Sequence, residues 1–233
     1  MLFEKLKAYL VAKNAERPPS KNITLSNLGA CRRQLGYKYH GFPALPADSD
    51  RVFVFDDGTN LHESIRQLML KAGIQLEDQE KRVEAKLLPE YSVRGQIDGI
   101  VVLDGHKYLF ELKSASSGSF WKMLKGDLGL RYTAQIQASL EATGLTSCVV
   151  LLKNKENGQF GEVAVYKDDD IIQNLRERLK TVITSTPDNL PAPDFGPNED
   201  GEYPYECIGC SYRNHCVGKI DLKAPSYKKK SKT

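Results

Sequence analysis

GQIDGIVVLDGHKYLFELK, residues 95–113, contains two apolar runs that are separated by Asp104-Gly105. An Asp-Gly pair between apolar runs predicts a β-hairpin, because a two-residue type I′ turn needs positive φ at both central positions. Counting outward from that turn sets Asp98 opposite Glu111 on one face of the sheet, with Cβ atoms about 5 Å apart. Lys113 follows two residues later and therefore points to the same face.

The two opposed acids have apolar neighbours along both strands, so this hairpin is expected to lie in the interior of the protein. Like charges directly opposite one another destabilise a strand pair, and a buried charge must be paired or bound to a metal. A divalent cation between the carboxylates would remove the conflict, and oxygen ligands suit Mg²⁺ or Mn²⁺. The alternative is a different register, in which both acids lie solvated at a sheet edge.

The whole chain has the composition of a soluble globular protein, with 233 residues of which 40% are hydrophobic and 27% are charged. This length allows one core with additions, or two small domains. The net charge of +3 is compatible with a polyanionic partner without requiring one. No apolar run is long enough to span a membrane, and the N-terminus lacks the apolar segment of a signal peptide. We therefore expect a cytoplasmic protein, in which cysteines more often bind metal than form disulfides.

Hydrophobic periodicity and turn residues along the rest of the chain predict a mixed α/β sheet flanked by helices. Helices are expected over 1–17, after a Ser26 N-cap, and over 56–71, 130–143 and 168–184; strands are expected over 82–87, 96–103, 106–113, 147–153 and 161–166. Residues 41–55, 114–129 and 187–204 have loop composition, and the Lys-rich residues 221–233 are expected to form a disordered basic tail.

The order and spacing of Asp98, Glu111 and Lys113 resemble the PD-(D/E)xK nuclease superfamily, and more specifically its RecB-like branch. GQIDGI at 95–100 fits the GxxDxI setting of the family's aspartate. Upstream, GTNLH at 58–62 matches the GxxxH element of the same branch. An ExK sequence or a lone histidine often occurs by chance and does not identify a family. The motifs identify this family better in combination, because they follow its order and lie on the expected helix and strands.

A glutamine motif of this family is also present, in the sequence YTAQIQ at residues 132–137. The tyrosine that often follows the family's glutamine by four residues is missing, because Ser139 follows Gln135 and Glu141 follows Gln137. Either glutamine could therefore have the family role. The order YxAQxQ is closer to phage-type recombination exonucleases, which favours Gln135.

The resemblance implies a restriction-endonuclease-like core over residues 56–186 that hydrolyses phosphodiester bonds with a divalent cation. It assigns the metal ligands and catalytic groups residue by residue: His62, Asp98, Glu111 and the Leu112 carbonyl as ligands, with Lys113 and Gln135 joining the two acids as catalytic residues. A cation provides a nucleophile at neutral pH and neutralises charge on the phosphate, and a lysine on the same face adds a donor. An imidazole ligand favours Mn²⁺ over Mg²⁺.

Five cysteines are present, and three of them form a compact C-x2-C-x5-C run at Cys207, Cys210 and Cys216. Two thiolates with this spacing can hold one metal, and either Cys31 or His215 could supply a fourth ligand. Zinc is the usual metal for such ligand sets. Cys148 lies in an apolar strand, where a small buried side chain is expected.

The early cysteine, the nuclease core and the late cysteine run together resemble the iron–sulfur nucleases, which include the Cas-four family of CRISPR adaptation nucleases. The sequence Cys31-Arg32-Arg33 resembles their C-P-R element, with Arg32 in the place of proline. This resemblance implies a structural [4Fe–4S] cluster that joins the N-terminal segment 1–55 to the C-terminal segment 187–220. The four expected ligands are Cys31, Cys207, Cys210 and Cys216, with zinc as the alternative metal.

These observations together predict a DNA exonuclease that acts on single strands or duplex ends, most often from 5′ to 3′ in the resembled family. Expected DNA contacts are Arg32, Arg33, Phe120, Trp121, Lys122, Lys125, Arg131 and Tyr132, the aromatic ones by stacking. The alternatives are a non-catalytic DNA-binding adaptor with the same fold and a structure-specific endonuclease. Expected partners are CRISPR adaptation or phage recombination proteins, or further copies of the chain in a ring.

Overall fold

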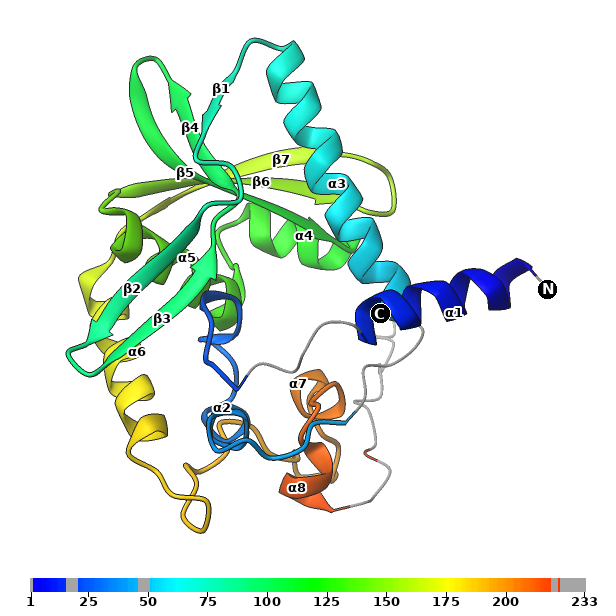
Figure 1. Cartoon of the computed structure of the whole chain (residues 1–233), viewed down its shortest axis with the longest axis vertical. Helices are drawn as coiled ribbons and strands as arrows, with labels where there is room; N and C mark the ends of the chain where they lie inside the picture. The colour runs from blue at the N-terminus through cyan, green and yellow to red at the C-terminus, as the bar shows by residue number, and fades with distance from the viewer. Residues whose placement is uncertain (1, 16–20, 46–50, 219–221, 223–233) are drawn as a thin grey trace, which may run out of the picture. The chain divides into compact units, whose positions relative to one another are not determined.

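The computed structural model describes residues 2–15, 21–45, 51–218 and 222, so the predicted basic tail lies outside the described residues except for Leu222 (Figure 1). Contacts divide the chain into two compact units. Unit 1 consists of Met1–Gly29 and Asp48–Glu177, and unit 2 consists of Ala30–Ala47 and Arg178–Thr233.

Unit 1 contains a five-stranded sheet in the order β1-β4-β5-β6-β7. Its strands are β1 (Gln75–Glu77), β4 (Gly99–Leu103), β5 (His106–Ala115), β6 (Ser147–Asn154) and β7 (Phe160–Tyr166). The pair β5–β6 is parallel and the other pairs are antiparallel, so the predicted mixed sheet is confirmed. A separate two-stranded sheet pairs β2 (Arg82–Leu88) with β3 (Tyr91–Gln96).

The central hairpin β4–β5 has the predicted register. Leu103 pairs with His106, and the pairing continues to Gly99 opposite Phe110. Asp104 and Gly105 form the two-residue turn with φ of 49° and 78°, as a type I′ turn requires. The pairing ends there, so the predicted opposition of Asp98 and Glu111 lies one position beyond the paired residues.

Helices of unit 1 cover both faces of the sheet (Figure 1). On one face, Ile65 and Met69 of α3 (Arg51–Lys71) pack against Val101, Phe110 and Leu112. On the other face, α4 (Ser117–Leu124) and α5 (Gly129–Thr143) bury a second cluster with Ile100, Leu109, Cys148, Val150 and Leu152 of the strands. The alternation of side chains along β5 thus produces two apolar layers. Helix α1 (Leu2–Ala15) contacts α3, with Phe3 stacked on Phe53 at 5.7 Å.

The chain leaves one sheet and enters the other at Ile97-Asp98, so the predicted continuous strand over 96–103 is wrong. Strand β3 ends at Gln96 and β4 begins at Gly99. The Ile97 N–H donates to the Lys81 carbonyl at 3.1 Å instead of to a strand of the larger sheet. A Cβ on Gly99 would lie 2.8 Å from Leu76 Cδ1 and 3.2 Å from the Glu77 carbonyl oxygen, so glycine suits this close approach of β1. Asp98 therefore lies at the junction between two sheets.

Four other expectations differ from the structure. Helix α4 occupies residues 117–124 of the predicted loop 114–129, because Phe120 and Met123 bury one face of it. Helix α3 begins at Arg51, five residues earlier than predicted, and the short strands β1 and β3 were not predicted. Ser26 lies within the 3-10 turn Leu25–Asn27 (η1), and the helix that follows Cys31 is α2 (Arg32–Tyr39). The part of the predicted loop at 46–50 lies outside the described residues.

Helix α6 (Asp169–Ile183) runs from unit 1 into unit 2. The Asp168 carboxylate accepts the N–H groups of Asp170 and Ile171 at 3.0 Å each and so caps it. Unit 2 also contains α2 and two short helices, α7 (Tyr205–Ile208) and α8 (Arg213–Val217). None of the described helices combines the length and the apolarity that a bilayer span requires.

Candidate metal-dependent active site and cysteine cavity

Glu111 of β5 is the buried centre of a side-chain network in unit 1, with only 1% of its surface exposed. Gln135 of α5 donates from Nε2 to Glu111 Oε1 at 2.8 Å, and the Lys113 ammonium forms an ion pair with the same oxygen. Lys113 also donates to Gln135 Oε1 at 3.4 Å. The second carboxylate oxygen, Oε2, is buried without a hydrogen-bond partner among the described residues. One oxygen is thus fixed by protein groups while the other is available to a ligand.

Asp98 joins this network from the junction between the sheets. Its Oδ2 accepts the backbone N–H of Leu112 at 2.7 Å, which holds the carboxylate against β5. Its Oδ1 lies 3.4 Å from Nδ1 of His62, which projects from α3. The structure therefore brings His62, Asp98, Leu112 and Glu111 together from three different segments of the chain.

A carboxylate that the sequence did not indicate, Glu80, lies at the same place. Ligand atoms of His62, Glu80 and Asp98 all lie within 4.8 Å of one another, and in the described part of the chain no other group of three His, Cys, Asp or Glu side chains does so. Glu80 belongs to a turn before β2 and not to a strand or a recognisable motif. Only the folded chain, in which that turn meets the Asp98 junction, could have identified it.

Burial determines the protonation of these groups. It raises the pKa of Asp98 to about 6, although the hydrogen bond from the Leu112 N–H acts to lower this pKa. It also raises the pKa of Glu111 to about 7, although the Lys113 ammonium acts to lower it. Burial, together with Lys113, lowers the pKa of His62, which favours the neutral imidazole that metals bind. Burial also opposes the charge of Lys113, but the Glu111 carboxylate outweighs it and raises the lysine pKa.

These shifts predict how the stability of the metal-free protein depends on pH. Asp98 binds its proton more tightly in the folded state, where its pKa is about 6, than in the unfolded chain, where it is 3.8. The free energy of unfolding should therefore fall as pH rises through this interval, because the unfolded state then binds fewer protons. In the presence of a chelator, Asp98→Asn should raise the melting temperature relative to wild type by on the order of 5 °C at pH 7 and by much less at pH 4.

The difference between variant and wild type isolates Asp98, because all other carboxyls contribute to both proteins. The amide oxygen of the introduced asparagine can still accept the Leu112 N–H, so the change removes the charge more than the contact. Asp127→Asn, at an exposed position after α4, is the matched control and should show no such pH-dependent gain. A constant difference between the two proteins from pH 4 to pH 7 would contradict the prediction.

The two glutamines of α5 have different surroundings. Gln135 bridges Glu111 and Lys113, as described above. Gln137 is also buried, but it donates to the Tyr166 carbonyl at 2.8 Å and accepts the Asp168 N–H at 2.9 Å. It therefore joins α5 to the link between β7 and α6. This placement favours Gln135 over Gln137 for a role beside the acids.

The expected DNA contacts of unit 1 differ in their accessibility. Trp121 is 47% exposed and Lys122 and Lys125 are exposed on α4 and just after it, whereas Phe120 is fully buried and cannot stack on a base. Arg131 is exposed and donates to the Ser26 carbonyl at 3.2 Å. The Tyr132 ring faces the Lys113 ammonium at 4.9 Å, so it contacts the acid network directly.

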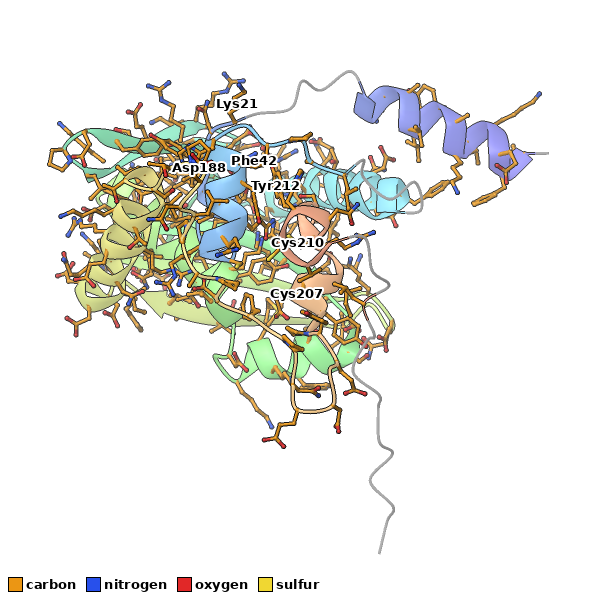
Figure 2. All side chains as sticks on the ribbon, turned by 90° about the horizontal axis from the view of Figure 1, so that it is seen from below. Lys21, Phe42, Asp188, Cys207, Cys210 and Tyr212 are labelled. Carbon is orange, nitrogen blue, oxygen red and sulfur yellow. The ribbon has the colours of Figure 1, made fainter. Side chains whose placement is uncertain are left out.

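In unit 2, all four cysteines of the expected cluster line one cavity. Cys31 precedes α2, Cys207 lies in α7, Cys210 follows α7, and Cys216 lies in α8; Figure 2 labels two of these thiols. Burial raises the pKa of Cys207 to about 11, and the charges of the other three thiols contribute to the shift. The fifth cysteine, Cys148, is buried in β6 within unit 1, as predicted.

Polar groups around this cavity contact the sulfur atoms. The Asp194 N–H lies 3.3 Å from Cys31 Sγ, and the Tyr212 N–H lies 3.4 Å from Cys210 Sγ. Arg33 and Arg213 line the same cavity and oppose the rise in thiol pKa at Cys216 and Cys210, respectively. Such N–H donors and cations stabilise thiolates, the form in which cysteine binds metals.

Two further predictions in unit 2 concern His215 and the arginines. His215 Nε2 lies 2.9 Å from the Pro43 carbonyl, and the imidazole packs against the rings of Tyr37 and Phe42. His215 is not among the residues that line the cysteine cavity, whereas Cys31 is, and this placement favours Cys31 as the fourth ligand. Arg32 forms an ion pair with Asp194 at 2.6 Å, so its charge is already partnered.

No protein-family model and no curated protein matches this sequence. Solved structures do match it. SSO0001 aligns over 95% of this chain and 98% of its own, with 16% identity and a TM-score of 0.61. LHK-Exo, an alkaline exonuclease from Laribacter hongkongensis whose structure was solved in complex with dAMP, aligns over 71% of this chain and 87% of its own, with 15% identity and a TM-score of 0.52.

A phage-related exonuclease from Haemophilus somnus aligns over 69% of this chain and 91% of its own, with 13% identity and a TM-score of 0.51. This chain has the fold of these exonucleases. Identities this low support the fold alone, because one fold can carry many activities. Activity must be argued from the residues of the site.

Proposed function

We propose that this protein is a divalent-metal-dependent DNA exonuclease that acts on single strands or duplex ends. The observation that carries the proposal is Glu111, a fully buried carboxylate with one oxygen unpartnered among the described residues, set beside Asp98 and paired with Lys113. A buried acid in this setting needs a cation, and two acids, an imidazole and a lysine suit phosphodiester hydrolysis. The shared fold of two exonucleases agrees with this assignment.

The residues of the site fit a hard or borderline divalent cation such as Mg²⁺ or Mn²⁺. His62, Asp98, Glu111 and the Leu112 carbonyl would hold it, with three oxygen ligands and one imidazole nitrogen. When bound, the cation would polarise the phosphate and supply a nucleophile at neutral pH. Deprotonation of Asp98 and Glu111 must accompany binding, because burial raises the pKa of both carboxyls.

Lys113 and Gln135 complete the proposed mechanism. The Lys113 ammonium keeps its proton, because Glu111 raises its pKa, and can donate it as a hydrogen bond to the phosphate or to the attacking water. Gln135 fixes the orientation of both Glu111 and Lys113 through one amide group. Cleavage from 5′ to 3′ is the expected polarity, and Trp121, Lys122, Arg131 and Tyr132 are the proposed DNA contacts in unit 1.

We further propose that Cys31, Cys207, Cys210 and Cys216 bind a [4Fe–4S] cluster that is structural. The support is that these four thiols line one cavity in unit 2 and that four thiolates are a ligand set of such a cluster. Tetrahedral zinc held by the same four thiolates is the alternative.

An assay of DNA cleavage tests the nuclease proposal. End-labelled linear single-stranded and duplex DNA should be degraded to nucleotides with Mn²⁺, and degradation should stop in a chelator and return when Mn²⁺ is restored. Covalently closed circular DNA should remain intact. Discrete products from the circle would favour the structure-specific endonuclease. Binding of DNA with no cleavage in either metal would favour the non-catalytic adaptor, whose partners would then be CRISPR adaptation or phage recombination proteins.

A further inference from the structure

Glu80 is held beside Asp98 by an unusual turn. Lys81 N–H donates to the Asp78 carbonyl at 3.1 Å, and Asp78 and Glu80 both adopt positive φ, of 50° and 53°. Two bonds fix this turn to the junction between the sheets: Ile97 N–H donates to the Lys81 carbonyl, and Gln96 Nε2 donates to the Glu80 carbonyl at 2.7 Å. Non-glycine residues persist in the left-handed region where the surrounding structure holds them there, often at functional sites.

The Glu80 carboxylate has two competing neighbours of different kinds. One of its oxygens forms an ion pair with the Arg66 guanidinium. A ligand atom of the same residue also lies within 4.8 Å of those of His62 and Asp98. Arg66 follows His62 by one helical turn on α3, so both side chains lie on the same face of the helix. Glu80 therefore lies between a permanent cation and the proposed metal site.

A second observation indicates that this place receives a cation. Glu111, which is only 1% exposed, has an oxygen without a hydrogen-bond partner among the described residues, and its charge acts on both His62 and Asp98. Glu80 and Asp98 thus lie beside one imidazole on which the Glu111 charge also acts, whereas Lys113 is paired with Glu111 and Arg66 with Glu80. Additional positive charge at this point would relieve the repulsion among the acids.

We propose that Glu80 is an exchangeable ligand of the divalent cation and that Arg66 competes with the cation for it. The inference rests on the metal site of the proposed function and adds a ligand and a competitor to it. A bound cation repels the nearby guanidinium and attracts the carboxylate, so occupancy transfers Glu80 from Arg66 to the metal. Arg66 then remains paired with Glu63, whose Oε2 it contacts at 3.0 Å.

Mn²⁺ binding without DNA, measured by isothermal titration calorimetry on the full chain, tests the inference. Glu80→Gln should weaken Mn²⁺ binding by about tenfold or more, as loss of a metal-orienting partner typically does. Arg66→Gln should act in the opposite direction and tighten binding, because it releases Glu80. In the double variant most of this gain should disappear, since the competitor acts through Glu80. Glu84→Gln, which breaks an exposed ion pair with Arg94 and not one with Arg66, is the matched control and should leave the affinity unchanged.

Three outcomes would overturn the inference. These are an unchanged affinity in Glu80→Gln, a loss of affinity in Arg66→Gln, and an equal gain from Arg66→Gln with and without Glu80. Melting temperatures of all variants identify any that fail to fold, and Glu80→Asp supplies a second variant that keeps the charge. These measurements of Mn²⁺ affinity do not depend on DNA cleavage. They can therefore disprove the role of Glu80 while Mn²⁺-dependent degradation of DNA by wild type still supports the proposed function.

Discussion

Replacing Lys113 with alanine should lower kcat for Mn²⁺-dependent cleavage by about 10²–10³-fold, the usual cost of losing one charged donor at a developing oxyanion. Lys113 is the only cation that the structure places on Glu111 among the described residues, and it also contacts Gln135. The change removes the hydrogen-bond donor and leaves the buried Glu111 carboxylate without an ion pair. Single-turnover cleavage of labelled DNA measures the chemical step directly.

Lys107→Ala is the matched control, because Lys107 lies on the same strand but forms an exposed ion pair with Glu77. Its cleavage rate should remain within a factor of roughly two of wild type, as exposed pairs contribute little. DNA binding by Lys113→Ala should persist, measured by fluorescence anisotropy without a catalytic metal. Equal rates for Lys113→Ala and wild type would remove Lys113 from the mechanism and weaken the nuclease proposal.

Replacing Cys210 with serine should abolish the iron–sulfur cluster. Wild-type protein purified without oxygen should be brown and contain about four iron atoms per chain, whereas Cys210→Ser should be pale and iron-poor. The melting temperature should also fall, because metal-binding free energy contributes to folding where the ligands are brought together only by the fold. Cys31 and Cys207 are 176 positions apart in the sequence (207 − 31), so the cluster would close a long loop.

Cys148→Ala is the control for the cluster, since Cys148 is a buried thiol of β6 and does not line the cavity. It should keep both the colour and the iron content of wild type. A colourless wild-type protein with one zinc per chain would reject the cluster while leaving the four-cysteine site intact. If Cys148→Ala also lost its iron and colour, the loss in Cys210→Ser would reflect a less stable protein and not the removal of a cluster ligand.

The sequence predicted the parts of the site that depend on local register. A two-residue turn at Asp104-Gly105 determines which side chains of β4 and β5 are opposed, so counting was sufficient to relate Asp98 to Glu111. The C-terminal end of α5 was equally readable, because Gly144 adopts φ of 71° there. Strands β6 and β7 followed from their apolar and alternating patterns, although only β6 has buried residues and β7 is an edge strand.

What the sequence could not reveal depends on contacts between distant segments. Glu80 becomes relevant only because its turn bonds to Ile97 and Gln96, which are 16 or 17 positions away. Helix α4 was hidden by a Ser- and Gly-rich composition, and its amphipathic face becomes clear only when Phe120 and Met123 are seen to be buried. The break at Ile97-Asp98 was equally hidden, since both sides of it have strand-like composition.

The tip of the β4–β5 hairpin is exposed, and a side chain at Gly105 would meet nothing within 4 Å. Space does not limit the side chains at this tip, although the positive φ of Asp104 and Gly105 does, and the number of residues in each strand is limited as well. One extra residue in β5 before Glu111 would turn every later side chain of that strand to the opposite layer and put Phe110 in the place of the buried acid. The position of the buried acid thus depends on the number of residues that separate it from an exposed turn, although no residue of that turn belongs to the proposed active site.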